Sequence, residues 1–229
     1  MKYLEGNLCV TIMDTSILQV DKKQDMILCG TNSNYDWIVV ADGHGNNTVI
    51  DFLRNLDWES IIQLENPIDT VKKKLIDINT TDSGSTLSIV KSYPTHIDMH
   101  WVGDSTIKIY KKNRLLYAST DHNHKNRHKY PHLEGENLKC KNGWDINLID
   151  KNTISMIPAP YYVLSNGDTV NMFSVLGHDN LLDYTERKRV NIEMNTDTKT
   201  DIDANNNSDY KIVVGSDGFW NMVLTDDDN

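Results

Sequence analysis

The feature that most constrains this chain is an apolar run at residues 37–41, WIVVA, which leads directly into Asp42-Gly43-His44-Gly45. The run does not alternate with polar residues, which is typical of a strand buried on both faces. The Asp-Gly-His-Gly motif therefore lies at the end of a buried strand. A second apolar run, at residues 211–215, leads in the same way into Ser216-Asp217-Gly218.

Other parts of the sequence predict several more strands and a few helices. An antiparallel meander with a hairpin is indicated by β-type composition in four segments, residues 85–91, 97–103, 106–110 and 115–117. Helical patterns cover residues 47–64 and 69–79, with Asp69 as the expected N-cap. Residues 170–182 are expected to hold a short helix. Together these segments predict an α/β domain with mainly antiparallel strands.

Length, charge and cysteine content narrow the class of protein. At 229 residues the chain suits one domain, and 38% hydrophobic with 24% charged residues is typical of a globular protein. A net charge of −10 argues against a nucleic-acid partner. We expect no leader and no membrane span, because long apolar runs are missing. Three cysteines without a CxxC pair predict a reduced, cytoplasmic or otherwise intracellular setting.

Three times a β-type segment ends in a pairing of aspartate and glycine: Asp42-Gly43, Gly103-Asp104 and Asp217-Gly218. Any single pair is more often a turn than a ligand, because these dipeptides are common in turns. Carboxylates at several strand ends can nevertheless converge on one sheet edge and bind Mg²⁺ or Mn²⁺. Two such cations can activate a water and clamp a phosphoryl group, so the repeated pairs predict hydrolysis of phosphate esters.

Five motifs resemble, in the same order, those of the PPM (type 2C) metal-dependent protein phosphatases: ADGHG, SGSTL, WVGDS, TDH and VGSDGFW. The resemblance covers nearly the whole chain. It implies an α+β fold, a four-layer α/β-β/α sandwich in which two mainly antiparallel sheets are flanked by helices. It also implies a single domain over residues 1–229 that hydrolyses phosphoserine and phosphothreonine in phosphoprotein substrates, with two Mg²⁺ or Mn²⁺ ions and a third, more weakly held one.

The resemblance assigns metal-binding roles to individual residues. Asp42 resembles the carboxylate that bridges two metals, and Gly43 resembles the residue whose carbonyl contacts one of them. Asp217 resembles a ligand of the first metal, and together with Asp104 it would hold the third. Asp25 matches an acidic position that is expected to contact a metal through water.

The resemblance also concerns substrate binding and proton transfer. His44 resembles the histidine that protonates the leaving serine or threonine oxygen. The family arginine that grips substrate phosphate has no counterpart, since Val20 occupies its position, so Lys22 or Lys23 would have to bind the phosphate. His178 stands where the family usually has an aspartate, in a segment expected to be structural rather than catalytic.

The missing arginine and the end of the chain leave alternatives open. The sequence stops at Asn229, whereas the family continues to a further metal ligand, so the domain is expected to lack a C-terminal helix and a closing strand. One alternative is a catalytically impaired pseudophosphatase that acts as a binding or regulatory module, and another is a phosphohydrolase of small molecules. Four histidines are expected in a solvated loop rather than at a zinc site: His122, His124, His128 and His132.

Overall fold

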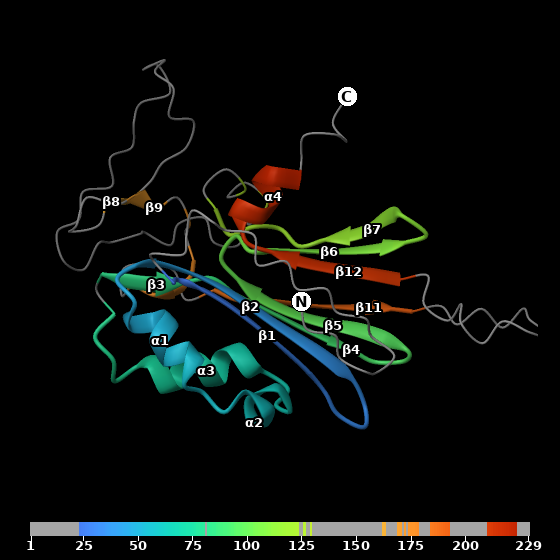
Figure 1. Ribbon diagram of the computed structural model, residues 1–229, viewed down its shortest axis with the longest axis horizontal. Coiled ribbons are helices and arrows are strands. Elements are labelled where there is room, and N and C mark those ends of the chain that lie inside the picture. Colours follow the sequence, from blue (N-terminus) through green and yellow to red (C-terminus); the bar gives the residue numbers. More distant parts are fainter. Residues whose placement is uncertain are drawn as a thin grey trace, which may run out of the picture.

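The structure is a computed structural model that describes residues 23–80, 82–123, 126, 129, 162–163, 169–170, 172, 174–178, 184–192 and 210–223. The described strands form two antiparallel sheets, one of seven strands and one of three, and a separate two-stranded ladder (Figure 1). Three helices lie along one side of the larger sheet. This arrangement confirms the expected α+β fold of two antiparallel sheets flanked by helices.

The strand that carries the Asp-Gly-His-Gly motif, β2 (Asp36–Gly45), lies inside the larger sheet. It pairs with other strands along both of its edges: β1 (Asp25–Thr31) on one, β3 (Ser83–Ser85) and β4 (Leu87–Ser92) on the other. The sheet continues through three further strands: β5 (His96–Val102), β10 (Leu176–Gly177) and β11 (Glu186–Asn191). The prediction of a buried strand before the motif is confirmed.

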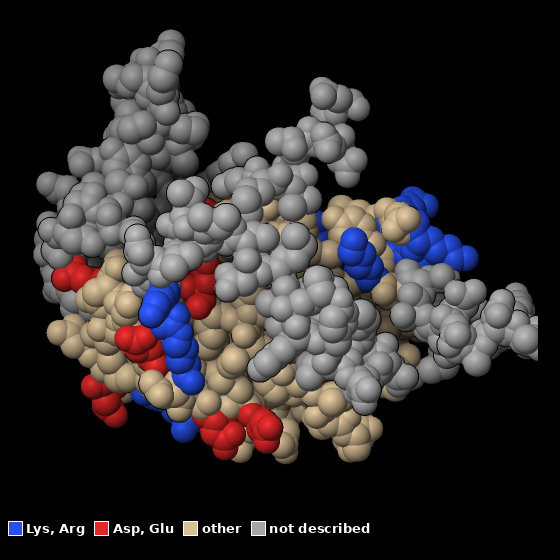
Figure 2. All heavy atoms as spheres, viewed as in Figure 1, with Lys and Arg blue, Asp and Glu red and all other residues tan. Residues whose placement is uncertain are grey.

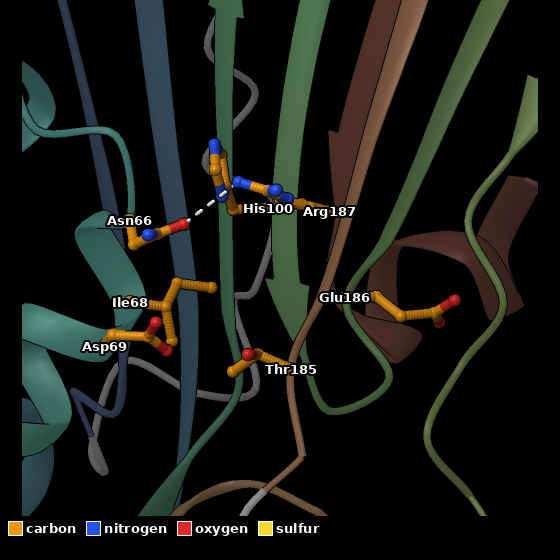
Figure 3. A pocket seen from close by; sticks show the side chains of 7 residues that line it. All are labelled: Asn66, Ile68, Asp69, His100, Thr185, Glu186 and Arg187. Carbon is orange, nitrogen blue, oxygen red and sulfur yellow. Dashed lines mark hydrogen bonds between the residues drawn. The ribbon is translucent and has the colours of Figure 1, made fainter. Parts of the chain in front are cut away.

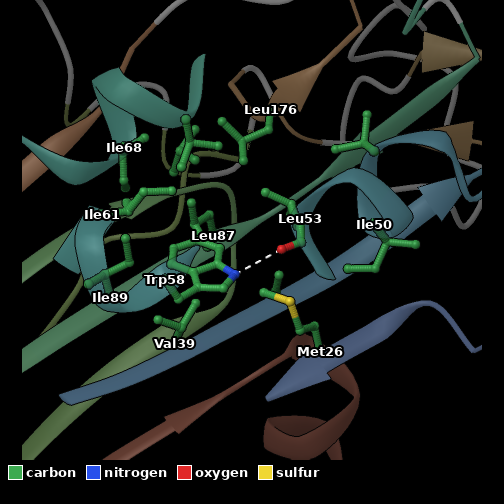
Figure 4. Close-up of a cluster of buried hydrophobic side chains, with 14 of the residues drawn as sticks. Met26, Val39, Ile50, Leu53, Trp58, Ile61, Ile68, Leu87, Ile89 and Leu176 are labelled. Carbon is green, nitrogen blue, oxygen red and sulfur yellow. Dashed lines mark hydrogen bonds between the residues drawn. The ribbon is translucent and has the colours of Figure 1, made fainter. Parts of the chain in front are cut away.

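The helices bury the outer face of the larger sheet under a dense apolar cluster. They are α1 (Thr48–Arg54), α2 (Trp58–Ile62) and α3 (Pro67–Leu75). Leu53 and Leu87 are fully buried in this cluster, and the Trp58 indole donates a hydrogen bond of 2.8 Å to the Leu53 carbonyl (Figure 4). Full burial of one such side chain stabilises the fold by about 1.5–3 kcal/mol, so this cluster anchors the sheet that carries the motif.

The helical segments differ from their predicted limits. The single helix expected over residues 47–64 is wrong, because α1 and α2 are separate. The Asp57 side chain accepts a hydrogen bond from the Ser60 N–H at 3.2 Å, and an N-cap of this kind starts a new helix. The next helix begins at Pro67, two residues before the predicted N-cap Asp69, since proline suits the first helical turn.

The chain crosses from the larger to the smaller sheet at Gly103, which has a positive φ of 92°. The smaller sheet has the order β12 (Tyr210–Gly215), β6 (Thr106–Lys111), β7 (Arg114–Ala118). The predicted meander is therefore split: β4 pairs with β5 and β6 pairs with β7, but β5 and β6 lie in different sheets. Side chains that include Met99, Ile107 and Ile109 fill the space between the two sheets.

The second half of the chain differs from expectation in two places. The helix predicted over residues 170–182 is wrong, because the described part of it ends β9 (Thr169–Val170) and contains β10, but no helix. The strand β11, with sequence ERKRVN, had no apolar signal in the sequence. The remaining described elements are β8 (Tyr162–Val163), which pairs with β9, and the helix α4 (Asp217–Val223) directly after β12.

Charged side chains are distributed unevenly over the described surface. In Figure 2, acidic and basic side chains are interspersed over the helical layer, and basic ones gather near the tip of the β6–β7 hairpin. That tip carries Lys111, Lys112 and Arg114, about 20 Å along β6 from Asp104, given the rise of a strand. In the part of the chain that the structure describes, no helix is long and apolar enough to cross a membrane.

Candidate metal centre

Asp25 and Asp42 lie side by side on neighbouring strands. The antiparallel register of β1 and β2 pairs these two residues, and directly opposite side chains point to the same face of a sheet. Burial and the negative charges of Asp25, Asp217 and Asp104 raise the pKa of Asp42 from 3.8 to about 8, and a side-chain hydrogen bond to Asp25 adds to this effect. The pair therefore favours a bound proton or cation over two separate negative charges.

Asp104 and Asp217 approach the same place from the smaller sheet. Asp104 follows β5 in the crossover, and Asp217 begins α4 just after β12, whose last residue, Gly215, pairs with Thr106. Burial, with the negative charges of Asp217 and Asp121, raises the pKa of Asp104 to about 7. The four predicted aspartates thus interact electrostatically, although each comes from a different part of the chain.

Asp121 is a fifth carboxylate that had no assigned role in the sequence. It accepts a hydrogen bond of 2.8 Å from the Thr106 hydroxyl, and burial raises its pKa. Its charge acts on Asp104 because β7 returns antiparallel to β6 and brings the end of the hairpin back to the crossover. In the sequence, only the TDH motif includes this residue.

The segment Ser83–Ser85 and the following Thr86 fasten the motif to the crossover. The Asp42 N–H donates to the Thr86 hydroxyl at 3.0 Å, and the Thr86 N–H donates to the Asp42 carbonyl at 2.9 Å. The Ser85 hydroxyl donates to the same carbonyl at 3.1 Å. Because the Thr86 hydroxyl also lies 2.5 Å from that of Ser105, next to Asp104, the two halves of the acidic cluster are hydrogen-bonded together.

Gly43 and His44 continue β2 beyond Asp42. The Gly43 N–H donates to the Gln24 carbonyl at 2.9 Å. Among the described residues, the buried Nε2 atom of His44 has no hydrogen-bond partner. Burial and the neighbouring His178 lower the pKa of His44 to about 3, so its imidazole is neutral at pH 7. The His178 ring stacks on that of His44, so a residue expected to be purely structural touches a candidate catalytic one.

The predicted phosphate-binding lysines are only partly placed. Lys22 lies outside the described residues. Lys23 is exposed two residues before Asp25, and its carbonyl accepts a hydrogen bond from the Arg54 guanidinium. Arg54 also donates to the Asp25 carbonyl at 3.0 Å and forms an ion pair of 2.8 Å with Asp51. A second cationic side chain, which the sequence had not indicated, therefore lies at this end of β1.

The donor set suits a hard divalent cation. Among the described residues, no three His, Cys, Asp or Glu side chains are grouped closely enough to hold an ion by themselves. Magnesium, however, is commonly held by one or two carboxylates together with several waters. Asp42 with Asp25, or Asp104 with Asp217, could provide these carboxylates. The raised pKa values of Asp42 and Asp104 fit this use, since a cation would replace the proton they favour.

A hollow of about 200 Å³ lies on the other side of the larger sheet, between α3 and β11 (Figure 3). Its lining consists of Asn66, Ile68, Asp69, His100, Thr185, Glu186 and Arg187, none of which is a predicted site residue. The Glu186 side chain points away from the hollow in Figure 3, and its Oε2 atom lies 3.2 Å from Nε2 of His122. His122 is fully buried, so its expected place in a solvated loop is wrong. The other three histidines of that cluster lie outside the described residues.

The comparison with known proteins rests on solved structures, because no protein-family model and no curated protein matches the chain. A serine-threonine phosphatase 2C from Toxoplasma gondii matches with a TM-score of 0.52 and 11% identity, over 86% of this chain and 74% of that one. The chain has the fold of a type 2C phosphatase. A sex determining protein of C. elegans matches with a TM-score of 0.50 and 17% identity, over 76% of this chain.

The similarity to these solved structures is one of fold, and it covers only part of the length of each chain. The chain spans 46% of the C. elegans protein. In this type 2C fold the two sheets direct strand ends toward one edge, which explains why aspartates after β5 and β12 meet those of β1 and β2.

Proposed function

We propose that the chain is a member of the PPM (type 2C) family, a single domain that hydrolyses phosphoserine and phosphothreonine in phosphoproteins with Mg²⁺ or Mn²⁺. The observation that carries the proposal is the convergence of Asp25, Asp42, Asp104 and Asp217 within a type 2C fold. Buried carboxylates that raise one another's pKa are typical of catalytic and metal-binding sites. The similar Toxoplasma protein, a serine-threonine phosphatase, supports the substrate class.

Divalent ions at these carboxylates would supply an activated water and an electrostatic clamp for the phosphoryl group. Asp42 and Asp25 would hold the ions from the larger sheet, with the carbonyl of Gly43 beside them. The two aspartates after β5 and β12 would hold them from the smaller sheet. Because hydrogen bonds with residues 85–86 fix the backbone of Asp42, its carboxylate needs little reorganisation to bind.

His44 would protonate the leaving serine or threonine oxygen. Its pKa of about 3 makes it neutral at pH 7, so this role requires the negative charge of a bound phosphate to raise that pKa. Lys23, exposed near Asp25, and Lys22 would bind phosphate oxygens as point charges. The proton from His44 would leave with the alcohol when the bond between phosphorus and the leaving oxygen breaks.

Two observations favour the catalytically impaired alternative. A histidine that stays neutral is a weak acid toward an alkoxide leaving group, and burial holds His44 in that state. Val20 also stands at the position of the family arginine. A chain that keeps the fold under these two conditions would bind phosphoproteins without hydrolysing them and would act as a regulatory module.

Metal-dependent turnover distinguishes the two functions. We expect the chain to hydrolyse p-nitrophenyl phosphate and a phosphothreonine peptide in the presence of Mn²⁺. We expect this hydrolysis to stop when EDTA is added. Asp42→Asn should lower kcat by about 100-fold or more, because it removes a ligand central to charge stabilisation. The matched control, Asp77→Asn, changes an exposed carboxylate after α3 and should leave kcat unchanged. Phosphopeptide binding without turnover in Mn²⁺ or Mg²⁺ would favour the regulatory module instead.

A further inference from the structure

The rings of His44 and His178 stack with centroids 4.9 Å apart and planes inclined by 22°. The two residues come from strands on opposite sides of β3. His44 pairs with Gly84 from one side, and Gly177, the neighbour of His178, pairs with Gly84 from the other. The two rings therefore meet across the middle strand, and one of them, His44, is the candidate general acid.

Gly84 makes this contact sterically feasible. A Cβ atom at this position would lie 2.4 Å from Nε2 of His44 and 2.5 Å from Cδ2 of His178. Distances below 3.0 Å are not tolerated between such atoms, so any larger residue would push at least one ring away. The absence of a side chain at Gly84 is thus what lets both rings lie over the same point of β3.

The backbone holds His178 in an unusual conformation to make this contact. Its φ is 47°, in the left-handed region that non-glycine residues rarely adopt. Its N–H lies 3.2 Å from the Thr80 carbonyl and 3.3 Å from the Ser83 carbonyl, and these hydrogen bonds fix the turn. Its side chain is buried. A strained conformation that the surroundings enforce is often tied to function.

The orientation of the His44 ring depends on packing. Its Nε2 atom is buried and forms no hydrogen bond within the part of the chain that the structure describes, so no bond at that atom sets the ring angle. The flat face of His178 and the bare backbone of Gly84 lie directly against the ring and confine it on those sides. A general acid works only when its proton faces the leaving oxygen at hydrogen-bond distance, so confinement of the ring matters for the reaction.

We propose that His178 is a positioning residue, which uses ring stacking across Gly84 to hold the His44 imidazole toward the leaving oxygen of the substrate. The inference rests on the proposed phosphatase function and deepens it. It assigns a role to the position at which the chain carries histidine where an aspartate is expected. The role requires a flat ring, and it requires no charge or proton on that ring.

Two substitutions of His178 distinguish the contribution of its ring from that of its backbone conformation. Asparagine tolerates the left-handed conformation and removes the ring, whereas phenylalanine keeps a ring without nitrogen atoms. With a phosphoserine peptide and Mn²⁺, His178→Asn should lower kcat about 10- to 100-fold at an unchanged KM. His178→Phe should keep most of the wild-type kcat. His96→Asn, a partly exposed histidine at the start of β5, serves as the matched control and should leave kcat unchanged.

The leaving group provides a readout that a general loss of structure would not change. p-Nitrophenolate leaves without help from an acid, so His178→Asn should reduce its release far less than it reduces phosphoserine hydrolysis. In a His44→Asn background, His178→Asn should add no further loss, because the residue acts through His44. Ring-proton NMR shifts of His44, which report the stack without any turnover, should move in His178→Asn and stay close to wild type in His178→Phe.

Several results would overturn the inference. Positioning by stacking would be refuted if His178→Asn lowered kcat equally on both substrates, or if the losses in the double variant were additive. It would also be refuted if His178→Phe were as impaired as His178→Asn. Unmoved His44 shifts in a folded His178→Asn protein would refute the stack itself. Absence of turnover in the wild-type protein on either substrate would instead overturn the proposed function, and with it this role.

Discussion

The raised pKa of Asp42 predicts that the candidate metal centre weakens the fold when no cation is bound. The folded pKa is about 8 and the ordinary value is 3.8, so between these pH values the folded chain holds a proton that the unfolded chain releases. The free energy of unfolding therefore falls as pH rises from about 4 to 8. At pH 7 the loss amounts to about 4 kcal/mol, since each pKa unit corresponds to about 1.4 kcal/mol.

Asp42→Asn removes this charge and should stabilise the metal-free protein. An amide still needs buried hydrogen-bond partners, which offsets about 1–2 kcal/mol, so we expect a net gain of about 2–3 kcal/mol at pH 7. The gain should shrink below about 1 kcal/mol at pH 4.5, because this pH lies less than one unit above the ordinary pKa of 3.8, so that little of the destabilisation has yet developed. The same variant should lose both the activity and the stabilisation that Mn²⁺ gives to the wild-type protein.

Urea unfolding, followed by tryptophan fluorescence in EDTA at both pH values, measures the effect. The chain has five tryptophans, and Trp37, Trp58, Trp101 and Trp220 are buried. Asp77→Asn should shift the free energy of unfolding by less than about 0.5 kcal/mol at either pH, as expected for a surface substitution. A destabilised Asp42→Asn protein, or a gain that is equal at pH 7 and pH 4.5, would show that burial and the neighbouring carboxylates do not raise the pKa of Asp42 in the folded chain.

Two further predictions concern stability. Leu53→Ala should lower the free energy of unfolding by about 2–5 kcal/mol, because the Leu53 side chain is fully buried against the sheet. The control Leu115→Ala should cost much less, because Leu115 is 48% exposed. Equal effects of the two substitutions in urea titrations would contradict the placement of Leu53 in the core. Burial lowers the pKa of His100 from 6.5 to about 4, so the folded chain takes up fewer protons than the unfolded one, and stability is lost as pH falls through this range. His100→Gln should reduce the stability difference between pH 7 and pH 5 by about 2 kcal/mol, and an unchanged difference would count against a buried neutral imidazole.

The sequence was informative where local chemistry decides the structure. A continuous apolar run before Asp42 predicts a strand buried on both faces, and β2 has that form. The sequence could not reveal that the chain changes sheets after β5, because two consecutive β-type segments look the same whether or not they pair. Likewise β11 consists largely of charged residues, which edge strands carry to avoid unwanted pairing and which hide the usual strand pattern.

The residues of the candidate site likewise divide into those that the sequence could predict and those that it could not. Asp42, Asp104 and Asp217 could be selected because each stands next to glycine at the end of a β-type segment. Asp121 and His178 could not, since each becomes relevant only through a neighbour that is distant in sequence. Asp121 reaches Asp104 through the β6–β7 hairpin, and His178 reaches its partner ring across β3. Such tertiary contacts leave no local pattern.

The double pairing of β2 has a consequence for hydrogen exchange. Its amides are bonded to β1 on one edge and to β3 and β4 on the other, beneath a fully buried layer. Strands of this kind open only when the whole domain unfolds, whereas edge strands such as β11 fray at low cost. Deuterium should therefore enter the backbone around Asp42 last of all. Heat or denaturant that loosens the periphery would leave Asp42 in its native backbone pairing until the final cooperative transition.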